Sequence, residues 1–204
     1  MKKSTLIGMM AVLLAVAINS KASLYAVGSI PDGNPVGASF IGTYDQAAPG
    51  DTVSGLTVSL NISGGYNGNL YAYLVAPNGT LVTLLNQPGV TGGNPFGYAG
   101  SGLDVTLLDG APGSIQTTAE TSGASFSGTY QAAGTLANFN GSAADGTWTL
   151  FFADLVPGGG QATLNGWSLG ITAVPEPVNL ALGIMAAVVG GAGVVRRYFM
   201  LRHC

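Results

Sequence analysis

Between Ser23 and Val195 the chain has no lysine, arginine, histidine or cysteine. All six basic residues of the 204-residue sequence lie towards its two ends, and so do the single histidine (His203) and the single cysteine (Cys204). Without lysine or arginine the middle of the chain cannot neutralise phosphate groups, so we expect no nucleic-acid partner. Without cysteine it cannot form an internal disulfide.

The same absences remove the common catalytic centres. Ser-His-Asp and Cys-His arrangements need a histidine, and zinc sites use histidine or cysteine. Glycoside hydrolysis needs only two carboxyl groups. The middle, however, has a single glutamate, Glu120, in a Ser/Thr/Ala/Gly-rich stretch that is typical of a loop. We therefore predict that the protein is not an enzyme.

The middle of the chain is acidic, because eight carboxylates precede the tail and give it a net charge of −8. Calcium binds oxygen ligands from Asp, Asn and backbone carbonyls, and a bound cation would relieve the repulsion among these carboxylates. Calcium is therefore the one cofactor that the composition favours. The candidate ligands are Asp32, Asp154, Asp104 and Asp109. The alternative is that each is a solvated turn aspartate that bonds its own backbone.

Residues 1–22 are predicted to be a secretory signal peptide. Lys2 and Lys3 give a basic start, residues 6–18 are apolar, and Ser20-Lys21-Ala22 places small residues where signal peptidase cuts. We expect cleavage before Ser23, with cleavage after Ala26 as the second choice. The alternative is an uncleaved anchor, although the apolar run is short for the ~30 Å of hydrocarbon in a bilayer.

Residues 23–173 are predicted to form one all-β domain. Of the 33 glycines, 28 lie between residues 23 and 174, a composition that helices tolerate poorly. Asn78-Gly79 predicts a tight two-residue hairpin turn. Many short strands joined by Gly, Asn and Pro turns indicate a jelly-roll-like β-sandwich. Alternation of apolar and polar residues predicts strands at 56–62, 70–76, 80–85, 103–107, 147–152 and 167–171.

Three blocks of the domain resemble a known family. They are "SIPDGNPVG" (29–37), "SGLTVSLNISGGYNGNLYAYLVAPNGTLVTLL" (54–85) and "DGTWTLFFADLVPGGGQATLNGWSLGI" (145–171). In this order they resemble the P domain (P/Homo B domain) that follows the catalytic domain of subtilisin-like proprotein convertases. The resemblance implies a jelly-roll sandwich that is an accessory or binding module, and some members bind calcium. Asn69 stands where that family usually has Asp.

Aromatic residues in the predicted strands have two expected roles. Trp148 and Trp167 lie on alternating apolar faces, so we expect them in the core. Tyr71 and Tyr73 are predicted to point outward from one strand, and Tyr66 lies in the turn before it. An outward row of tyrosines can stack against sugar rings, or it can pack beneath another sheet or a loop.

The tail (174–204) begins with Val174-Pro175-Glu176-Pro177. An uncharged apolar run, 178–195, follows and ends at Arg196-Arg197. At 1.5 Å per residue these 18 residues would form ~27 Å of helix, just enough to span a membrane. The arginines predict a cytoplasmic C-terminus and an external domain. We therefore expect a single C-terminal transmembrane helix.

The order of the tail also resembles the PEP-CTERM sorting signal of exopolysaccharide-producing bacteria. That resemblance implies that an exosortase, an integral-membrane cysteine protease, recognises the motif and removes the helix. One departure is visible, because Tyr198 to Cys204 makes the tail longer than is usual. The alternative is a plain anchor, in which Pro-Glu-Pro is only a stiff linker.

The hypothesis that these features favour is a non-enzymatic exported protein of a Gram-negative bacterium. Signal peptidase and an exosortase would process it, the C-terminal helix would hold it in the membrane beforehand, and it would then reside at the cell surface or in the extracellular matrix. Extracellular polysaccharide is an expected partner. Two alternatives stay open: a calcium-dependent carbohydrate- or protein-binding adhesin, and an accessory domain that docks a separate protease.

Overall fold

A computed structural model of the chain describes residues 22–118, 126–176, 181–185 and 188. These residues form ten strands and two short 3-10 helices. The elements are β1 (Ala22–Leu24), β2 (Gly28–Ile30), β3 (Asn34–Tyr44), β4 (Thr52–Ser63), η1 (Asn67–Asn69), β5 (Leu70–Val75), β6 (Leu81–Asn86), β7 (Leu103–Leu107), β8 (Phe126–Tyr130), η2 (Leu136–Phe139), β9 (Gly146–Asp154) and β10 (Ala162–Val174).

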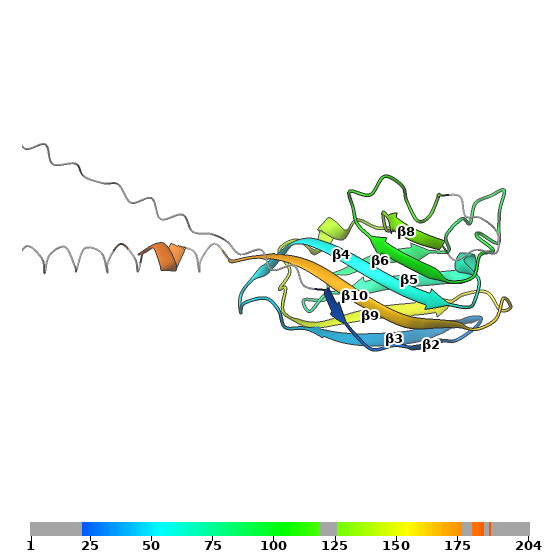
Figure 1. Ribbon diagram of the computed structural model, residues 1–204, viewed down its shortest axis with the longest axis horizontal. Helices are drawn as coiled ribbons and strands as arrows, with labels where there is room; N and C mark the ends of the chain where they lie inside the picture. Colours follow the sequence, from blue (N-terminus) through cyan, green and yellow to red (C-terminus); the bar gives the residue numbers. More distant parts are fainter. Residues whose placement is uncertain (1–21, 119–125, 177–180, 186–187, 189–204) are drawn as a thin grey trace, which may run out of the picture.

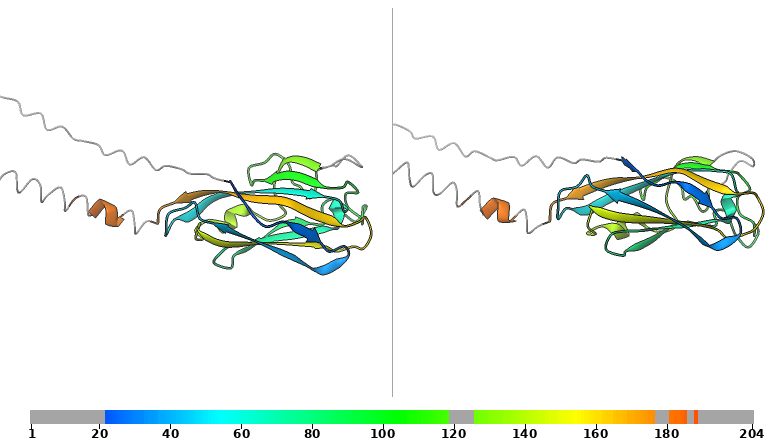
Figure 2. Two further views of the ribbon diagram at one scale, coloured as in Figure 1. Left: turned by 60° about the horizontal axis from the view of Figure 1, so that its bottom comes forward. Right: turned by 90° about the horizontal axis from the view of Figure 1, so that it is seen from below.

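The strands form two sheets that lie against each other as layers (Figures 1 and 2). The larger sheet has the order β1-β10-β4-β7-β8, and β2 also pairs with β10. The smaller sheet has the order β3-β9-β5-β6. All pairings are antiparallel except that of β7 with β8. The expected all-β sandwich is therefore confirmed.

The core lies between the two sheets and is formed by the alternate apolar residues of each strand. Trp148 on β9 and Trp167 on β10 are both fully buried, one from each sheet, as the apolar alternation predicts. Phe139 of η2 packs on Trp148 edge to face, with 5.3 Å between the ring centroids. The short helix thus fills the space between the sheets where the strands alone would leave a gap.

The period-two pattern located six strands correctly, to within a few residues at their ends. The element that the pattern missed entirely in the smaller sheet is β3, which contains Pro35 and Gly37. β3 is an edge strand paired only with β9, and its register shifts between Asn34 and Ala38. Proline is tolerated at such an edge, so the strand forms although its local sequence does not favour one.

The hairpin between β5 and β6 is correctly placed, but its turn is not the predicted two-residue type. The Gly79 N–H donates to the Ala76 carbonyl (2.9 Å), and the Ala76 N–H donates to the Thr80 carbonyl (2.9 Å). Only Gly79 has a positive φ, 86°, and Asn78 does not. Pro77 explains the difference, because its fixed φ favours the second position of a turn with negative φ.

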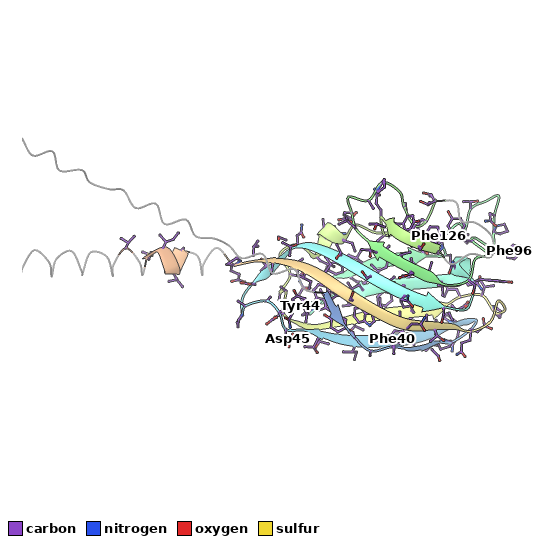
Figure 3. All side chains as sticks on the ribbon, in the orientation of Figure 1. Phe40, Tyr44, Asp45, Phe96 and Phe126 are labelled. Atoms are coloured by element: carbon purple, nitrogen blue, oxygen red, sulfur yellow. The ribbon has the colours of Figure 1, made fainter. Side chains whose placement is uncertain are left out.

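The sandwich is elongated, and β10 runs along it from one end to the other (Figure 1). At one end β10 starts beside β2, where Ala162 pairs with Ile30. At the other end it finishes with Val174 opposite Thr52. In Figure 3, Tyr44 and Asp45 lie at this second end and Phe96 lies at the first. The chain therefore leaves the domain far from the end that carries Asp154.

Candidate functional site

Asp154 lies where three strands of the smaller sheet meet. It is the last residue of β9, a strand with a neighbour on each side. Asn34 at the start of β3 pairs with it from one side, and Leu70 at the start of β5 pairs with it from the other. Because both sides are covered, Asp154 has no exposed surface at all.

The two carboxylate oxygens of Asp154 differ. Oδ1 accepts a hydrogen bond from the Val156 N–H (3.2 Å). Oδ2 is buried and forms no well-aligned hydrogen bond in the part of the chain that the structure describes, although the Gly33 N–H and the Asn69 side chain lie near enough to the carboxylate to stabilise its charge. An unsatisfied buried oxygen is costly, and most of all when it carries charge. Asp154 Oδ2 is therefore the atom at this end of the molecule that a cation could coordinate.

Burial is the main reason that the pKa of Asp154 lies above its ordinary value. The Val156 and Gly33 N–H groups and the Asn69 side chain lower this pKa, because they stabilise the charged form, whereas the nearby Asp32 carboxylate raises it by repulsion. A cation bound by both carboxylates would offset the repulsion between Asp32 and Asp154. It would also coordinate the buried Oδ2 of Asp154.

Asp32 reaches the cluster from the turn between β2 and β3. Its Oδ2 accepts a hydrogen bond from the Gly158 N–H (3.4 Å). The following residue, Gly33, has a φ of 60°, and a Cβ at that position would lie 2.7 Å from the Cα of Pro157. The turn is therefore pressed against the loop after β9. Two residues that the sequence proposed as metal ligands, Asp32 and Asp154, are thus brought together.

Asn69 is the residue of this cluster that the sequence did not suggest as a ligand. It is buried at the end of η1, and its Nδ2 donates to the carbonyls of Val156 (3.0 Å) and Gly158 (3.3 Å). The backbone carbonyl of Asn69 accepts a hydrogen bond from the Leu155 N–H (2.9 Å). Asn69 therefore holds the loop that surrounds Asp154. The one signal in the sequence was its departure from the Asp of the family pattern.

The other two proposed ligands are Asp104, in the larger sheet, and Asp109, in the turn that follows its strand β7. Asp104 is exposed on β7, in register with Asn61 of β4. Asp109 follows β7, and its two carboxylate oxygens accept hydrogen bonds from the N–H groups of Leu136 (2.8 Å) and Ala137 (2.7 Å). Asp109 thus satisfies the free donors at the start of η2.

The Asp154 cluster offers calcium two carboxylates. In the described ranges there is no group of three or more His, Cys, Asp or Glu side chains that could hold a metal ion. Calcium also accepts amide and backbone carbonyl oxygens and water, so two carboxylates are sufficient to begin a site. Asp154 and Asp32 are the residues that would hold the ion. The unsatisfied Oδ2 of Asp154 is the observation that supports the fit.

The proposed sorting motif begins where the fold ends. Val174 is the last residue of β10, and Pro175 and Glu176 follow it exposed. Pro177, Arg196 and Arg197 lie outside the described residues, as do most of the predicted span 178–195 and all of residues 1–21. Residues 181–185 are helical. Among the described residues there is no helix with the length and apolar character needed to cross a membrane.

Comparison with protein-family models and with curated proteins gives no match. Among solved structures, the serine protease of Aeromonas sobria in complex with its chaperone is similar over 74% of this chain and 27% of that chain, with 17% identity and a TM-score of 0.42. The same protease without the chaperone gives 18% identity and a TM-score of 0.41 over the same shares. This chain thus corresponds to about a quarter of the protease's length.

Proposed function

We propose that this chain is an exported, non-enzymatic surface or matrix protein of a Gram-negative bacterium. Signal peptidase removes residues 1–22, and the tail (174–204) holds the sandwich outside the membrane until an exosortase-type protease reads the Val-Pro-Glu-Pro motif. The sandwich is then displayed at the cell surface or in the extracellular matrix. The proposal includes a jelly-roll sandwich related to the P domain, acting as a binding module.

The observation that carries this proposal is the position of the motif relative to the fold. The ladder of β10 with β4 ends at the pair Val174–Thr52, and Pro175 has no N–H with which to continue it. Glu176 is exposed. A protease needs an accessible, extended segment, and Pro175 and Glu176 of the motif are the first residues that the sandwich leaves unpaired.

Intact-mass measurement on protein from the native host, compared between membranes, cell surface and medium, tests the proposal. We expect a mass that ends near Glu176 to Asn179 in the surface or medium fraction. The variant Glu176→Ala should accumulate in membranes with a mass that runs through Cys204. Asp45→Ala is the matched control, because Asp45 is an exposed carboxylate at the same end of the sandwich but outside the motif.

Two results would contradict the sorting proposal. If the wild-type chain runs through Cys204 and is found only in membranes, the apolar run is a permanent anchor and the sorting hypothesis is wrong. If Glu176→Ala and Asp45→Ala are both processed like the wild type, the glutamate is not recognised.

A second candidate function, a calcium-dependent binding module, is supported by Asp154. Its buried Oδ2 without a partner and the neighbouring Asp32 would together bind a cation. Calcium should then raise the melting temperature of the full chain in detergent, and a chelator should reverse the shift. Asp154→Asn should abolish the shift, whereas Asp104→Asn, on the other sheet, should retain it. Equal melting temperatures with calcium and with chelator would contradict the calcium site.

A further inference from the structure

The outer face of the smaller sheet carries a row of aromatic side chains. Leu70, Ala72 and Leu74 of β5 point into the core and are fully buried, so Tyr71 and Tyr73 point away from the other sheet. The ring of Tyr73 stacks on Phe151 of β9, with 4.6 Å between centroids. Tyr71 meets Tyr73 edge to face at 6.1 Å. The outward direction predicted for the two tyrosines is thus confirmed.

A hollow of about 470 Å³ lies beside this row, a volume within the range of small-ligand sites. Its far wall is the segment that contains Ala133 and Gly134, which lies along the outer edge of β6. The Ala133 N–H donates to the Leu84 carbonyl (2.9 Å), and the Gly134 N–H donates to the Thr83 carbonyl (2.8 Å). These backbone bonds fix the wall. The lining residues are Tyr71, Leu81, Val82, Thr83, Asn86, Ala133, Gly134 and Asn138.

The polar groups of the hollow are available to a ligand. Among the described residues, the Tyr71 hydroxyl and the side-chain amides of Asn86 and Asn138 form no hydrogen bond with protein. Asn86 is held in place through its backbone, because its N–H donates to Gln116 Oε1 (3.1 Å) and its carbonyl accepts from Gln116 Nε2 (2.6 Å). Its backbone therefore has a fixed position, and its side chain starts from the strand position directly opposite Tyr71.

The chemistry of the lining selects the ligand. No charged side chain lines the hollow, and the net charge of −8 on the domain would repel a polyanion. A purely apolar ligand would displace water from the two amides and the hydroxyl without replacing its hydrogen bonds. A sugar ring fits this lining. It is uncharged, its hydroxyls can hydrogen-bond to the amides, and its apolar face can stack on the tyrosine ring.

We propose that this hollow, centred on Tyr71, Asn86 and Asn138, is a binding site for a neutral glycan. The inference rests on the proposed extracellular function for the source of the glycan, and it names the ligand class of that function. The binding itself requires neither removal of the tail nor calcium. The site also lies on a different face from the Asp154 cluster, on the outward side of β5 and β6.

Affinity gel electrophoresis of the full chain in neutral detergent tests the site. The probes are the neutral polysaccharides dextran, barley β-glucan and galactomannan, with alginate as the polyanion. We expect at least one neutral polysaccharide to retard the protein and alginate not to do so. Tyr71→Ala and Asn86→Ala should each raise the apparent Kd about tenfold or more. Tyr66→Ala, which removes an exposed tyrosine outside the hollow, should bind like the wild type.

Several results would overturn the site: no retardation by any of the three neutral polysaccharides, retardation by alginate alone, or wild-type binding by both hollow variants. Asn86 is exposed, so its variant should keep the wild-type circular dichroism spectrum. Loss of binding there cannot then be attributed to unfolding. The two hypotheses fail separately: retardation of the full chain together with a membrane-only mass through Cys204 in the native host would disprove the sorting hypothesis but not the glycan site. A processed tail in the native host without retardation in the gel would do the opposite.

Discussion

The ring of Tyr25 packs on the ring of Trp167, with 4.5 Å between their centroids. The Trp167 indole N–H also donates to the carbonyl of the next residue, Ala26 (2.9 Å). The segment between β1 and β2 therefore covers a core tryptophan that is only 1% exposed. A mature protein that lacked this segment would expose Trp167 to water.

This contact predicts the N-terminus of the exported protein. Cleavage before Ser23 keeps Tyr25 and Ala26, whereas cleavage after Ala26 removes both and leaves the Trp167 N–H without its partner. We expect N-terminal sequencing of the exported protein to begin at Ser23. An N-terminus at Val27 would contradict the prediction, and it would mean that the sandwich tolerates an uncovered Trp167.

Substitution of Gly42 tests the same contact from the opposite side. Gly42 lies on β3, and a Cβ at this position would overlap the ring of Tyr25. Gly42→Ala should therefore displace the ring and lower the free energy of unfolding by about 1–3 kcal/mol, as overpacked cores do. Gly110→Ala is the matched control, because a Cβ there meets no atom within 4 Å. Urea denaturation of both variants would show the difference, and equal midpoints would refute the tight contact.

Asp154 predicts an unusual dependence of stability on pH in the absence of calcium. Because burial raises the pKa of Asp154, the native protein keeps this proton to a higher pH than the unfolded chain does. Between the two pKa values the native state binds more protons, so the free energy of unfolding falls as pH rises. The contribution of Asp154 is thus fully present below about pH 4, the ordinary pKa of aspartate, and is lost as pH rises through the native pKa.

Asp154→Asn removes this titration and keeps an acceptor for the Val156 N–H. In chelator, we expect the variant to be more stable than the wild type at pH 7 by about 1–3 kcal/mol, and the difference to shrink towards pH 4. Urea denaturation between pH 4 and pH 8 measures it. A difference that stays constant across this range would show that Asp154 does not titrate as its burial predicts. In saturating calcium, the second candidate function predicts that the wild type regains the lost stability.

The sequence was sufficient for the elements whose own pattern is strong. β4, β5, β7 and the centres of β9 and β10 follow period two, because one face of each packs on the core. β3 and β8 escaped prediction for a physical reason. β8 has one buried residue, Phe126, among exposed and half-buried ones, and it is held by parallel pairing with β7, which no local pattern reveals.

The Asp154 cluster could be predicted only in part. Asp32 and Asp154 are 122 positions apart, and no local pattern shows that these two of the four candidate aspartates lie together. The role of Asn69 depends on backbone carbonyls of the loop after β9. Every residue has a backbone carbonyl, so residue types alone cannot show which carbonyls Asn69 contacts. The hollow beside Tyr71 was beyond prediction for the same reason, since its far wall is attached through backbone bonds alone.

The hydrogen bonds of Asp109 predict a loss of stability on substitution that distinguishes a helix-capping role from a metal-binding role. Its carboxylate accepts two N–H groups at the start of η2, and η2 places Phe139 against Trp148. Asp109→Ala should lower the free energy of unfolding by about 1–2 kcal/mol, as the loss of a helix cap does. Asp109→Asn keeps one acceptor oxygen and should lose less. Asp104→Ala, at an exposed site near the start of β7, should leave the unfolding midpoint unchanged.

The calcium dependence of these variants decides between the two roles of Asp109. A cap acts equally with calcium and with chelator, so the destabilisation of Asp109→Ala should be the same in both conditions. Thermal denaturation in each condition provides the comparison. If Asp109→Ala instead abolished a calcium-induced rise in melting temperature while leaving the chelator value intact, Asp109 would be a ligand and the hydrogen bonds to η2 would be secondary.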